Sequence, residues 1–369
     1  MRICYISLGT SIHTKRWLNY FARRGHEVHL IASTFPAEYE GYDPSIEMHP
    51  LARLFPQIWK LSGPISGIFW LLQVRRIINR IEPDVLDAHY VGIPGYLAIA
   101  SGFHPFALNA WGTDILVNAK KSPLQKHLIK YALKKADLVT CTSSLLKEAI
   151  VDLGITPDKV KVAFLGVDTR KFSPGQKDEA LMQELGIVDS PVVISTRLFK
   201  PIYDLETLIK AIPLVLQEIP ETKFLFAGYG EQHIYLERLA SDLKIAGSIR
   251  FVGEVPHDIL PRYLTTSDVY VSTSLSDGTP QSLLEAMASG LAPVVSDIPP
   301  NRLWIRDGEN GYLFPLGDHK SLADRITYLL KKSEVRRAFG SANREIAKEK
   351  AEYEKRMADV ERMYQELVQ

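Results

Sequence analysis

Residues 272–300 read STSLSDGTPQSLLEAMASGLAPVVSDIPP. An apolar run ends at Ser272, a polar loop follows, and a helical pattern covers residues 281–289 before Gly290. A second apolar run then covers residues 293–296. Strand, helix and strand in this order form a βαβ unit, which places two parallel strands in one sheet. The stretch therefore predicts an α/β fold.

The same alternation continues on both sides of this stretch. The chain has 369 residues, more than one hydrophobic core usually serves, so two domains are expected. The alternation breaks at residues 169–177, TRKFSPGQK, where a Pro-Gly pair among polar residues indicates a linker. We expect strands at residues 2–8, 28–32, 84–88, 106–110, 138–141, 160–164, 191–195, 223–227, 249–252, 269–272 and 293–296.

These patterns predict two doubly wound domains. We place an N-terminal Rossmann-like domain at residues 1–172 and a C-terminal one at residues 173–345. Residues 346–369 are expected to form a C-terminal helix, as part of a helix over residues 345–368. In parallel sheets, ligands bind outside the carboxyl ends of the strands. Two such domains therefore predict a ligand cleft between them.

Composition excludes several classes of protein. The chain is 46% hydrophobic and 24% charged, as in ordinary globular proteins, and its net charge of +1 argues against a nucleic-acid partner. The two cysteines, Cys4 and Cys141, fall in apolar runs, so we expect reduced core residues rather than a disulfide framework. Residues 1–8, MRICYISL, lack the features of a signal peptide. A cytoplasmic protein is expected.

Two acids flank the strand-to-helix turn of the opening stretch. Asp277 lies in the polar loop, and Glu285 lies one turn into the helix that starts at residue 281. The free N–H groups and positive dipole end of a helix N-terminus favour phosphate or sugar oxygens. Carboxylates beside it can accept hydrogen bonds from sugar and ribose hydroxyls. Two structural alternatives remain open, a loop cap for Asp277 and a partly buried helix acid for Glu285.

The pattern that begins at Asp277 is an acid, seven residues, Glu, AMASG and an apolar strand. It resembles the signature of the retaining glycosyltransferases of family 4, the glycosyl transferases group 1. The resemblance implies the GT-B fold, in which two Rossmann-like doubly wound domains face a deep cleft. It implies that residues 1–172 form the acceptor-side domain, that residues 173–345 bind the nucleotide sugar, and that the helix at residues 346–369 returns to the first domain. It implies that Asp277, which stands where the family usually has Glu, and the loop of Gly278, Thr279 and Pro280 contact the donor sugar. Glu285 would bind the donor ribose.

Two further segments of the second half resemble the family. Residues 195–199, STRLF, resemble the strand end whose Arg grips the donor diphosphate, which implies this role for Arg197. The family usually has a Lys about six residues later; Tyr203 stands there, and Lys200 is the nearest cation. Residues 226–230, FAGYG, resemble the turn that brings Gly228 close to the donor.

Three strand ends of the first half carry candidate site residues. Gly9 follows the first strand, where the family's loop meets donor phosphate, and His13 would bind donor or acceptor. His89 ends a strand as the family's sugar-side His does. Trp111 and Asp114 follow another strand and would bind an acceptor sugar. Structural alternatives stay open for all four side chains, namely capping, core packing or a solvated surface.

The resemblance implies a hexosyltransferase type of reaction. A sugar would pass from a nucleoside-diphosphate sugar to an acceptor hydroxyl with retention of configuration. No cofactor and no metal are implied, in keeping with a sequence that has no DxD pair at a loop. A non-catalytic nucleotide-sugar-binding subunit and a nucleotide-sugar epimerase on the same fold are the alternatives. An NAD oxidoreductase is disfavoured because the first βα turn lacks GxGxxG.

The segment 51–80 bears on the acceptor. It contains no acid but is rich in basic and aromatic residues, namely Arg53, Lys60, Arg75, Arg76, Arg80, Phe55, Trp59, Phe69 and Trp70. This combination can bind an anionic membrane surface. One hypothesis is therefore a glycan or lipid-linked acceptor and a peripheral contact with the inner face of the membrane. The alternative is a crossover helix with a solvated basic face.

Overall fold

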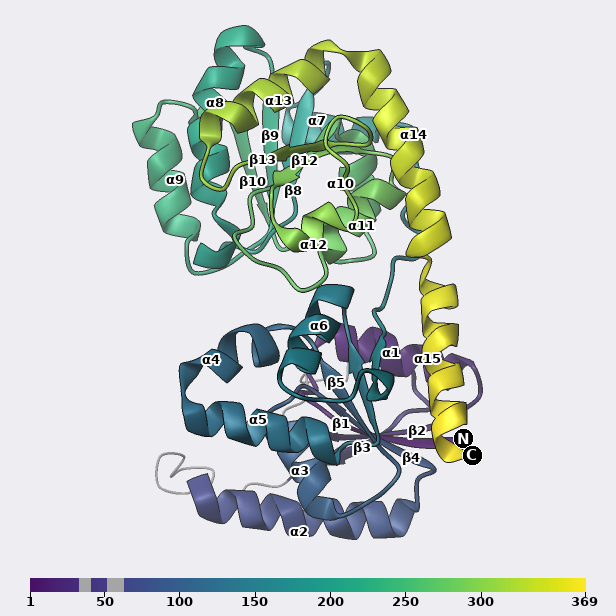
Figure 1. Ribbon diagram of the computed structural model, residues 1–369. Helices are drawn as coiled ribbons and strands as arrows, with labels where there is room; N and C mark the ends of the chain where they lie inside the picture. The colour runs from purple at the N-terminus through teal and green to yellow at the C-terminus, as the bar shows by residue number, and fades with distance from the viewer. Residues whose placement is uncertain (33–40, 52–62) are drawn as a thin grey trace. The chain divides into compact units, whose positions relative to one another are not determined.

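The chain forms two compact units in the computed structural model, which describes residues 1–32, 41–51 and 63–369 (Figure 1). The first unit contains residues 1–165 and 355–369, and the second contains residues 166–354. The division falls ahead of the linker predicted at residues 169–177. Each unit is built on one parallel β-sheet, so the predicted α/β class is confirmed.

The first unit has a seven-stranded sheet in the order β3-β2-β1-β4-β5-β6-β7. Its strands are β1 (Arg2–Ile6), β2 (Glu27–Ala32), β3 (Glu47–Pro50), β4 (Val85–His89), β5 (Phe106–Ala110), β6 (Leu138–Cys141) and β7 (Val160–Val162). The connecting helices are α1 (Ile12–Arg23), α2 (Gly63–Ile81), α3 (Ile93–Ser101), α4 (Ala119–Lys121), α5 (Pro123–Lys135) and α6 (Ser144–Asp152).

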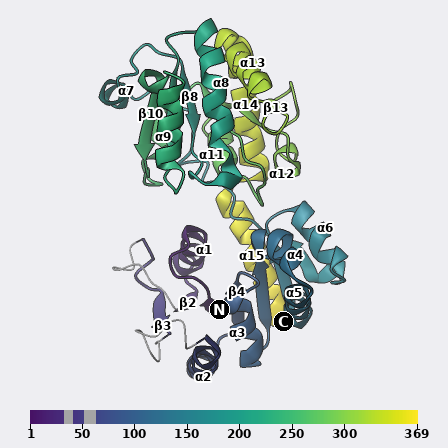
Figure 2. The same ribbon diagram turned by 90° about the vertical axis from the view of Figure 1, so that its left-hand side faces the viewer.

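Helices cover both faces of this sheet (Figure 2). Alternate residues of β1 show this, because successive side chains of a strand point to opposite faces. Cys4 and Ile6 pack in the core cluster that also contains Val74 of α2. Tyr5 faces the other way and contacts the ring of Phe21 in α1, 6.3 Å between centroids. Both cysteines are buried and free, as predicted.

The second unit has a six-stranded parallel sheet in the order β10-β9-β8-β11-β12-β13. Its strands are β8 (Val192–Ser195), β9 (Lys223–Ala227), β10 (Ile249–Gly253), β11 (Val269–Ser272), β12 (Ala292–Ser296) and β13 (Tyr312–Phe314). Its helices are α7 (Glu179–Leu185), α8 (Leu205–Glu218), α9 (His233–Asp242), α10 (Leu260–Thr266), α11 (Gln281–Ala288), α12 (Pro299–Arg302), α13 (His319–Lys331) and α14 (Ser333–Lys350). The last helix, α15 (Tyr353–Val368), packs on the first unit.

The two sheets reverse their strand order at equivalent places. In the first unit the chain runs from β1 outward to β3 and then crosses back to β4 on the other side of β1. In the second unit the chain runs from β8 outward to β10 and then crosses back to β11 on the other side of β8. Ligands of doubly wound folds bind at such a switch point, outside the carboxyl ends of the strands. The topology therefore directs attention to the residues after β1 and β4, and after β8 and β11.

Several elements differ from those predicted. Helix α2 begins at Gly63 rather than Phe69, with Pro64 near its start, where a missing N–H costs nothing. Strand β3 and helices α3 and α7 were not predicted. The helix expected over residues 345–368 is two helices, broken at Ala351 and Glu352. There Val167 accepts a hydrogen bond from the Tyr353 N–H and donates one to the Ala351 carbonyl. No helix among the described residues is long and apolar enough to cross a bilayer.

Candidate active site

Arg197 follows β8 at the switch point of the second sheet. It is only 8% exposed, and its Nη2 lies 2.6 Å from Asp277 Oδ2. Its Nη1 donates to Ser282 Oγ at 2.7 Å, and Ser282 in turn accepts from the Tyr270 hydroxyl at 2.8 Å. Burial opposes the charge, but Asp277 outweighs it and the pKa of Arg197 is raised. A fixed, fully charged guanidinium therefore lies at this strand end.

One face of the guanidinium is covered by Tyr203. The Arg197 Cζ lies 4.1 Å from the centre of the Tyr203 ring, a cation–π contact. Tyr203 occupies the position where the resemblance leads one to expect a second cation. Lys200 is exposed and stands at the start of the short helical turn Pro201–Tyr203. The structure therefore brings Arg197 and Asp277 together and leaves the Lys200 side chain in solvent.

Gly228 lies against the backbone of the Arg197 segment. A Cβ atom at Gly228 would come within 2.3 Å of the Arg197 carbonyl oxygen, and one at Gly230 within 2.4 Å of the Phe199 carbonyl oxygen. The Phe199 N–H also donates to the Tyr229 carbonyl at 2.9 Å. The loop after β9 thus packs directly on the loop after β8, which only glycine permits. Gly228 supports the position of Arg197 through this contact.

The loop between β11 and α11 holds the other predicted donor residues. Asp277 Oδ1 accepts a hydrogen bond from the Gly278 N–H at 2.8 Å, so this carboxylate spans its own loop and Arg197. Gly278 and Thr279 are half-buried, and Pro280 is buried at the start of α11. Both alternatives for Asp277, a loop cap and a site residue, are compatible with this geometry.

Glu285 faces a chain of polar side chains that the sequence did not predict. The Glu285 carboxylate is buried, and its Oε1 lies 3.0 Å from His257 Nε2. His257 Nδ1 lies 3.1 Å from Lys171 Nζ, which donates to Asp258 at 2.5 Å. Glu285 is therefore held in one orientation by residues from two other segments of the second unit.

His89 lies at the carboxyl end of β4 in the first unit, inside a cage of aromatic rings. Its imidazole is 1% exposed, with Nδ1 3.1 Å from Thr14 Oγ1 and Nε2 3.3 Å from Asp87 Oδ2. The rings of Trp17 and Trp111 lie 5.3 and 5.4 Å from it. The hydroxyl of Tyr364, from α15, donates to Asp87. The cage therefore joins β4, α1 and α15.

His13 and Trp111 lie next to this cage. Both are half-buried, and their rings meet edge to face at 5.3 Å. Gly9 is buried, and its carbonyl accepts a hydrogen bond from the Tyr42 hydroxyl at 2.8 Å. The first sheet thus gathers His13, His89 and Trp111 at its switch point, from three different strand ends.

Asp114 is fully buried and bonds only to its own surroundings in the part of the chain that is described. Its carboxylate accepts hydrogen bonds from backbone N–H groups of Val91, Trp111, Gly112 and Ile115, at 2.8 to 3.2 Å. Burial raises its pKa, and these hydrogen bonds oppose the rise. The geometry favours the structural alternative, in which Asp114 holds the turn after β5.

Residues important to both clusters were missed by sequence reasoning. Ser282 lies in the opening stretch and Tyr203 at the position of the family's Lys, but neither was predicted to contact Arg197. His257 contacts Glu285, and Tyr364 contacts Asp87 next to His89; neither belongs to a motif or to a regular spacing in the sequence. Four of the residues in the hypothesis of a membrane contact, Arg53, Phe55, Trp59 and Lys60, lie outside the described residues.

Family models match both units. Residues 177–346 match the model described as glycosyl transferases group 1, and residues 2–143 match the model described as glycosyl transferase 4-like. The chain is 26% identical over 373 residues to N-acetyl-alpha-D-glucosaminyl L-malate synthase of Bacillus anthracis, covering 99% of this chain and 96% of that protein. It is also 26% identical over 288 residues to a UDP-Gal:alpha-D-GlcNAc-diphosphoundecaprenol alpha-1,3-galactosyltransferase of Escherichia coli, covering 74% and 73%.

Solved structures share the fold over the full length. Anabaena HepE in complex with UDP-glucose superposes with a TM-score of 0.81 at 18% identity, covering 100% of both chains. Sucrose-phosphate synthase of Thermosynechococcus elongatus gives 0.83 at 18% identity, covering 100% of this chain and 99% of that one. The predicted GT-B fold of two Rossmann-like domains is confirmed. With both units matched by its models, the chain belongs to the group 1, or family 4, glycosyltransferases, which transfer a sugar from a nucleotide sugar.

Proposed function

We propose that this enzyme transfers a hexose from a nucleoside-diphosphate sugar to an acceptor hydroxyl with retention of configuration and without a metal ion. The observation that carries the proposal is the buried Arg197. Among the described residues its Nε has no hydrogen-bond partner, and neither has the Oγ of Ser195, two residues earlier in the chain. Buried donors are normally satisfied, so a ligand oxygen that accepts from them would complete the site.

The donor diphosphate takes this position. Its charge grows as the sugar–phosphate bond breaks, and a preorganised cation beside it lowers the barrier. Arg197 supplies that charge, and the N-terminus of α11 adds a positive dipole end. Lys200 is free to swing toward the same oxygens because its side chain is exposed. These cations support transfer that needs no metal.

The neighbouring residues take the rest of the donor. Asp277 and the loop of residues 278–280 contact the sugar, and Glu285 accepts from the ribose hydroxyls. The ion pair of Asp277 with Arg197 links sugar recognition to diphosphate recognition. His257 holds Glu285 ready for the ribose.

The rings of His13, His89 and Trp111 in the first unit form the acceptor side of the site. Trp111 and His13 are half-buried and can stack on a sugar, while the enclosed His89 fixes the wall behind them. Relatives with lipid-linked or small hydroxy-acid names support an acceptor hydroxyl on a lipid-linked glycan or a small molecule. Structures with UDP-glucose and a UDP-Gal relative support a uridine nucleotide as the first donor to test.

Turnover tests the proposal. The full chain is incubated with UDP-glucose, UDP-galactose or UDP-N-acetylglucosamine and a panel of acceptors, and the product is analysed by NMR. We expect an α-linked product from the α-linked donor. After EDTA treatment, adding Mg²⁺ or Mn²⁺ should leave the rate unchanged. An inverted product contradicts retention, and a rate that rises with metal contradicts metal independence. A changed sugar still joined to the nucleotide would identify an epimerase instead.

Helix α2 supports a peripheral membrane contact. Ile68 and Leu72 are 64% and 58% exposed, and Arg76, one further turn along, is exposed too. An apolar and basic strip of this kind binds anionic headgroups. Flotation with phosphatidylglycerol vesicles tests it. The wild type should float and Leu72→Glu should not, whereas Leu124→Glu, at the 69%-exposed Leu of α5, should float like the wild type. Absence of wild-type flotation contradicts the contact.

A further inference from the structure

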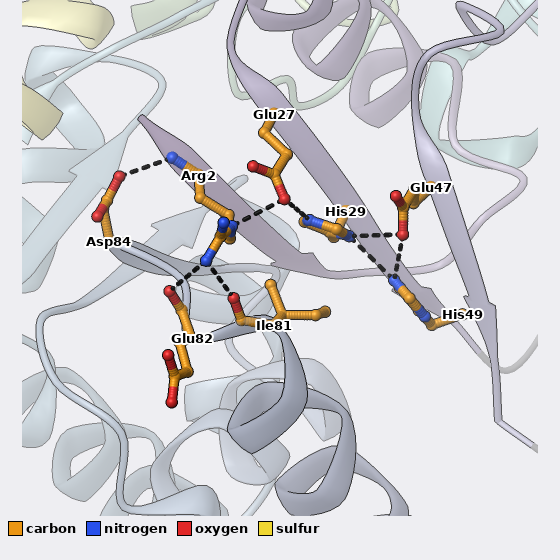
Figure 3. A network of polar contacts seen from close by, with 8 residues as sticks. All are labelled: Arg2, Glu27, His29, Glu47, His49, Ile81, Glu82 and Asp84. Atoms are coloured by element: carbon orange, nitrogen blue, oxygen red, sulfur yellow. Dashed lines mark hydrogen bonds and ion pairs between the residues drawn. The ribbon is translucent and has the colours of Figure 1, made fainter.

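Strands β2 and β3 carry two matched pairs of polar residues. Glu27 and His29 are two residues apart on β2, and Glu47 and His49 are two apart on β3. Residues two apart on a strand point to the same face. His29 is paired with Glu47 in the parallel register, so all four side chains meet on one face at the edge of the sheet (Figure 3).

Three of these side chains aim one atom each at a common point. His29 Nδ1 lies 3.1 Å from His49 Nε2 and 3.4 Å from Glu47 Oε2, and the last two atoms are 4.0 Å apart. Tetrahedral zinc with bonds of about 2.0–2.2 Å to nitrogen and oxygen separates its ligand atoms by roughly 3.3 Å. The three atoms are therefore spaced like one face of a zinc tetrahedron.

The opposite side of His29 has the partner that metal-bound histidines usually have. Its Nε2 lies 3.1 Å from Glu27 Oε1, and the same oxygen accepts from Arg2 Nε at 2.7 Å. Arg2 is itself anchored to the Ile81 carbonyl at 2.7 Å (Figure 3). A carboxylate on the distal N–H fixes the tautomer and leaves the other nitrogen free for a metal. Glu27 thus presents the lone pair of His29 Nδ1 to the common point.

The two histidines of this cluster are buried, and Glu47 is exposed to solvent. His29 and His49 are only 3% and 8% exposed, while the Glu47 side chain is 63% exposed. Two imidazoles are therefore held rigidly by the sheet, and the carboxylate closes over them from the solvent side. Water would supply the fourth ligand of a bound ion. Without a metal, the same arrangement would be a hydrogen bond between the two imidazoles.

We propose that His29 Nδ1, His49 Nε2 and Glu47 bind Zn²⁺, with Glu27 as the residue that orients His29. The ion would join the edge strand β3 to β2 and so stabilise this end of the first sheet. The ligands lie on strands other than those that carry His89, Trp111 and the donor residues, so this ion is separate from the transfer reaction.

Zinc binding by the full chain, freed of any affinity tag and of metal, tests the proposal. Zn²⁺ is titrated in competition with a chromophoric chelator, and Co²⁺ is used as a spectroscopic probe. We expect one Zn²⁺ per chain and the intense visible absorption of tetrahedral Co²⁺. The variants His29→Gln and His49→Gln should bind at least ~100-fold more weakly, and Glu27→Gln ~10–100-fold more weakly. Zn²⁺ should raise the melting temperature of the wild type and not of His29→Gln.

Two further variants make the result decisive. Glu47→Gln removes a ligand from an exposed position, so it keeps the fold even where a histidine variant does not. It should weaken Zn²⁺ binding about 10-fold or more. His104→Gln removes a histidine that is 57% exposed elsewhere in the first unit and should bind like the wild type. A wild type that binds no stoichiometric Zn²⁺, or a Glu47→Gln variant that binds as the wild type does, overturns the proposal and leaves a pair of hydrogen-bonded imidazoles.

Discussion

The guanidinium of Arg197 is charged, and its three nitrogens are held in fixed positions. Two of them bond to Asp277 and Ser282, and the third has no hydrogen-bond partner within the described residues. Arg197→Lys keeps the charge but presents a single ammonium, which cannot reproduce this fork. We expect the affinity for the nucleoside diphosphate, measured by calorimetry, to fall about 100-fold, or roughly 2.7 kcal/mol.

The matched control is Arg302→Lys. Arg302 also pairs with a carboxylate, Asp297, but its side chain is 60% exposed. Circular dichroism and melting temperature report whether each variant is folded. Equal nucleotide affinity in folded Arg197→Lys and Arg302→Lys would remove Arg197 from the donor site.

Gly228 allows the loops after β8 and β9 to pack directly on each other. Gly228→Ala places a methyl group 2.3 Å from the Arg197 carbonyl oxygen, and backbone cannot yield as a flexible side chain can. We expect about 1–3 kcal/mol of destabilisation in urea unfolding and weaker nucleotide binding. Gly247→Ala, where a Cβ meets nothing within 4 Å, should change neither. A Gly228→Ala variant as stable as Gly247→Ala would contradict this packing.

Residues at the strand ends could be predicted, but many of their partners could not. Arg197 and Asp277 follow strands that read clearly as apolar runs, so their place at the carboxyl edge follows from the βαβ order. His257 acts through a contact with Glu285, 28 residues further along the chain, which no local spacing encodes. The choice between the two interpretations of Asp114 depends on the burial and backbone hydrogen bonds of its carboxylate in the turn after β5, which the sequence does not reveal.

Helix α15 places a buried acid, Glu361, against the first unit. Glu361 Oε1 lies 2.7 Å from His26 Nε2, and its other oxygen accepts from the Tyr20 hydroxyl at 3.2 Å. Burial opposes the charge of Glu361, but His26 and Arg24 outweigh it, and its pKa is lowered. The pKa of an unfolded-chain Glu is about 4.3, and the pKa of Glu361 in the folded protein is lower. The charge of Glu361 therefore stabilises the fold above the pKa of the unfolded state, and this stabilisation is lost as the pH falls through the pKa of the folded state.

Glu361→Gln tests this dependence on pH. At pH 7 the variant should be less stable than the wild type by about 1–2 kcal/mol in urea unfolding. Because the wild-type advantage disappears once Glu361 is protonated, the gap should narrow below pH 4. Glu366→Gln, at an exposed position of the same helix, should match the wild type at every pH. A gap for Glu361→Gln that is independent of pH would contradict the role of its charge.

Elements were predicted best where the hydrophobic period was regular. The core strands β8, β9 and β11 lie within one residue of their predicted limits. Helix α3, IPGYLAIAS, is apolar on all sides and contains Pro94 and Gly95, so it lacks the amphipathic pattern of a surface helix. The break between α14 and α15 depends on backbone bonds to Val167, far away in the sequence.

The two sheets reverse their strand order in the same way, and this explains where the candidate site residues lie. Strand order reverses beside β1 and β8, and each reversal leaves a gap between the loops that follow neighbouring strands. In the second unit those loops carry Arg197 and Asp277, and in the first unit His13 lies at the start of α1 and His89 at the end of β4. The chain leaves the first unit at residue 165 and returns to it at residue 355. The βαβ rhythm predicts this architecture, whereas contacts between distant segments determine how each strand end is filled.

The central claim is that the second unit binds a nucleoside-diphosphate sugar through Arg197 and Glu285, and calorimetry tests it most directly. The full chain is titrated with UDP, GDP and ADP, beside Glu285→Ala and the control Glu237→Ala, whose Glu is 52% exposed on α9. The account predicts one nucleotide bound per chain, at least ~10-fold weaker binding by Glu285→Ala, and wild-type binding by Glu237→Ala. Failure of all three nucleotides to bind, or equal binding by Glu285→Ala and the wild type, would contradict it.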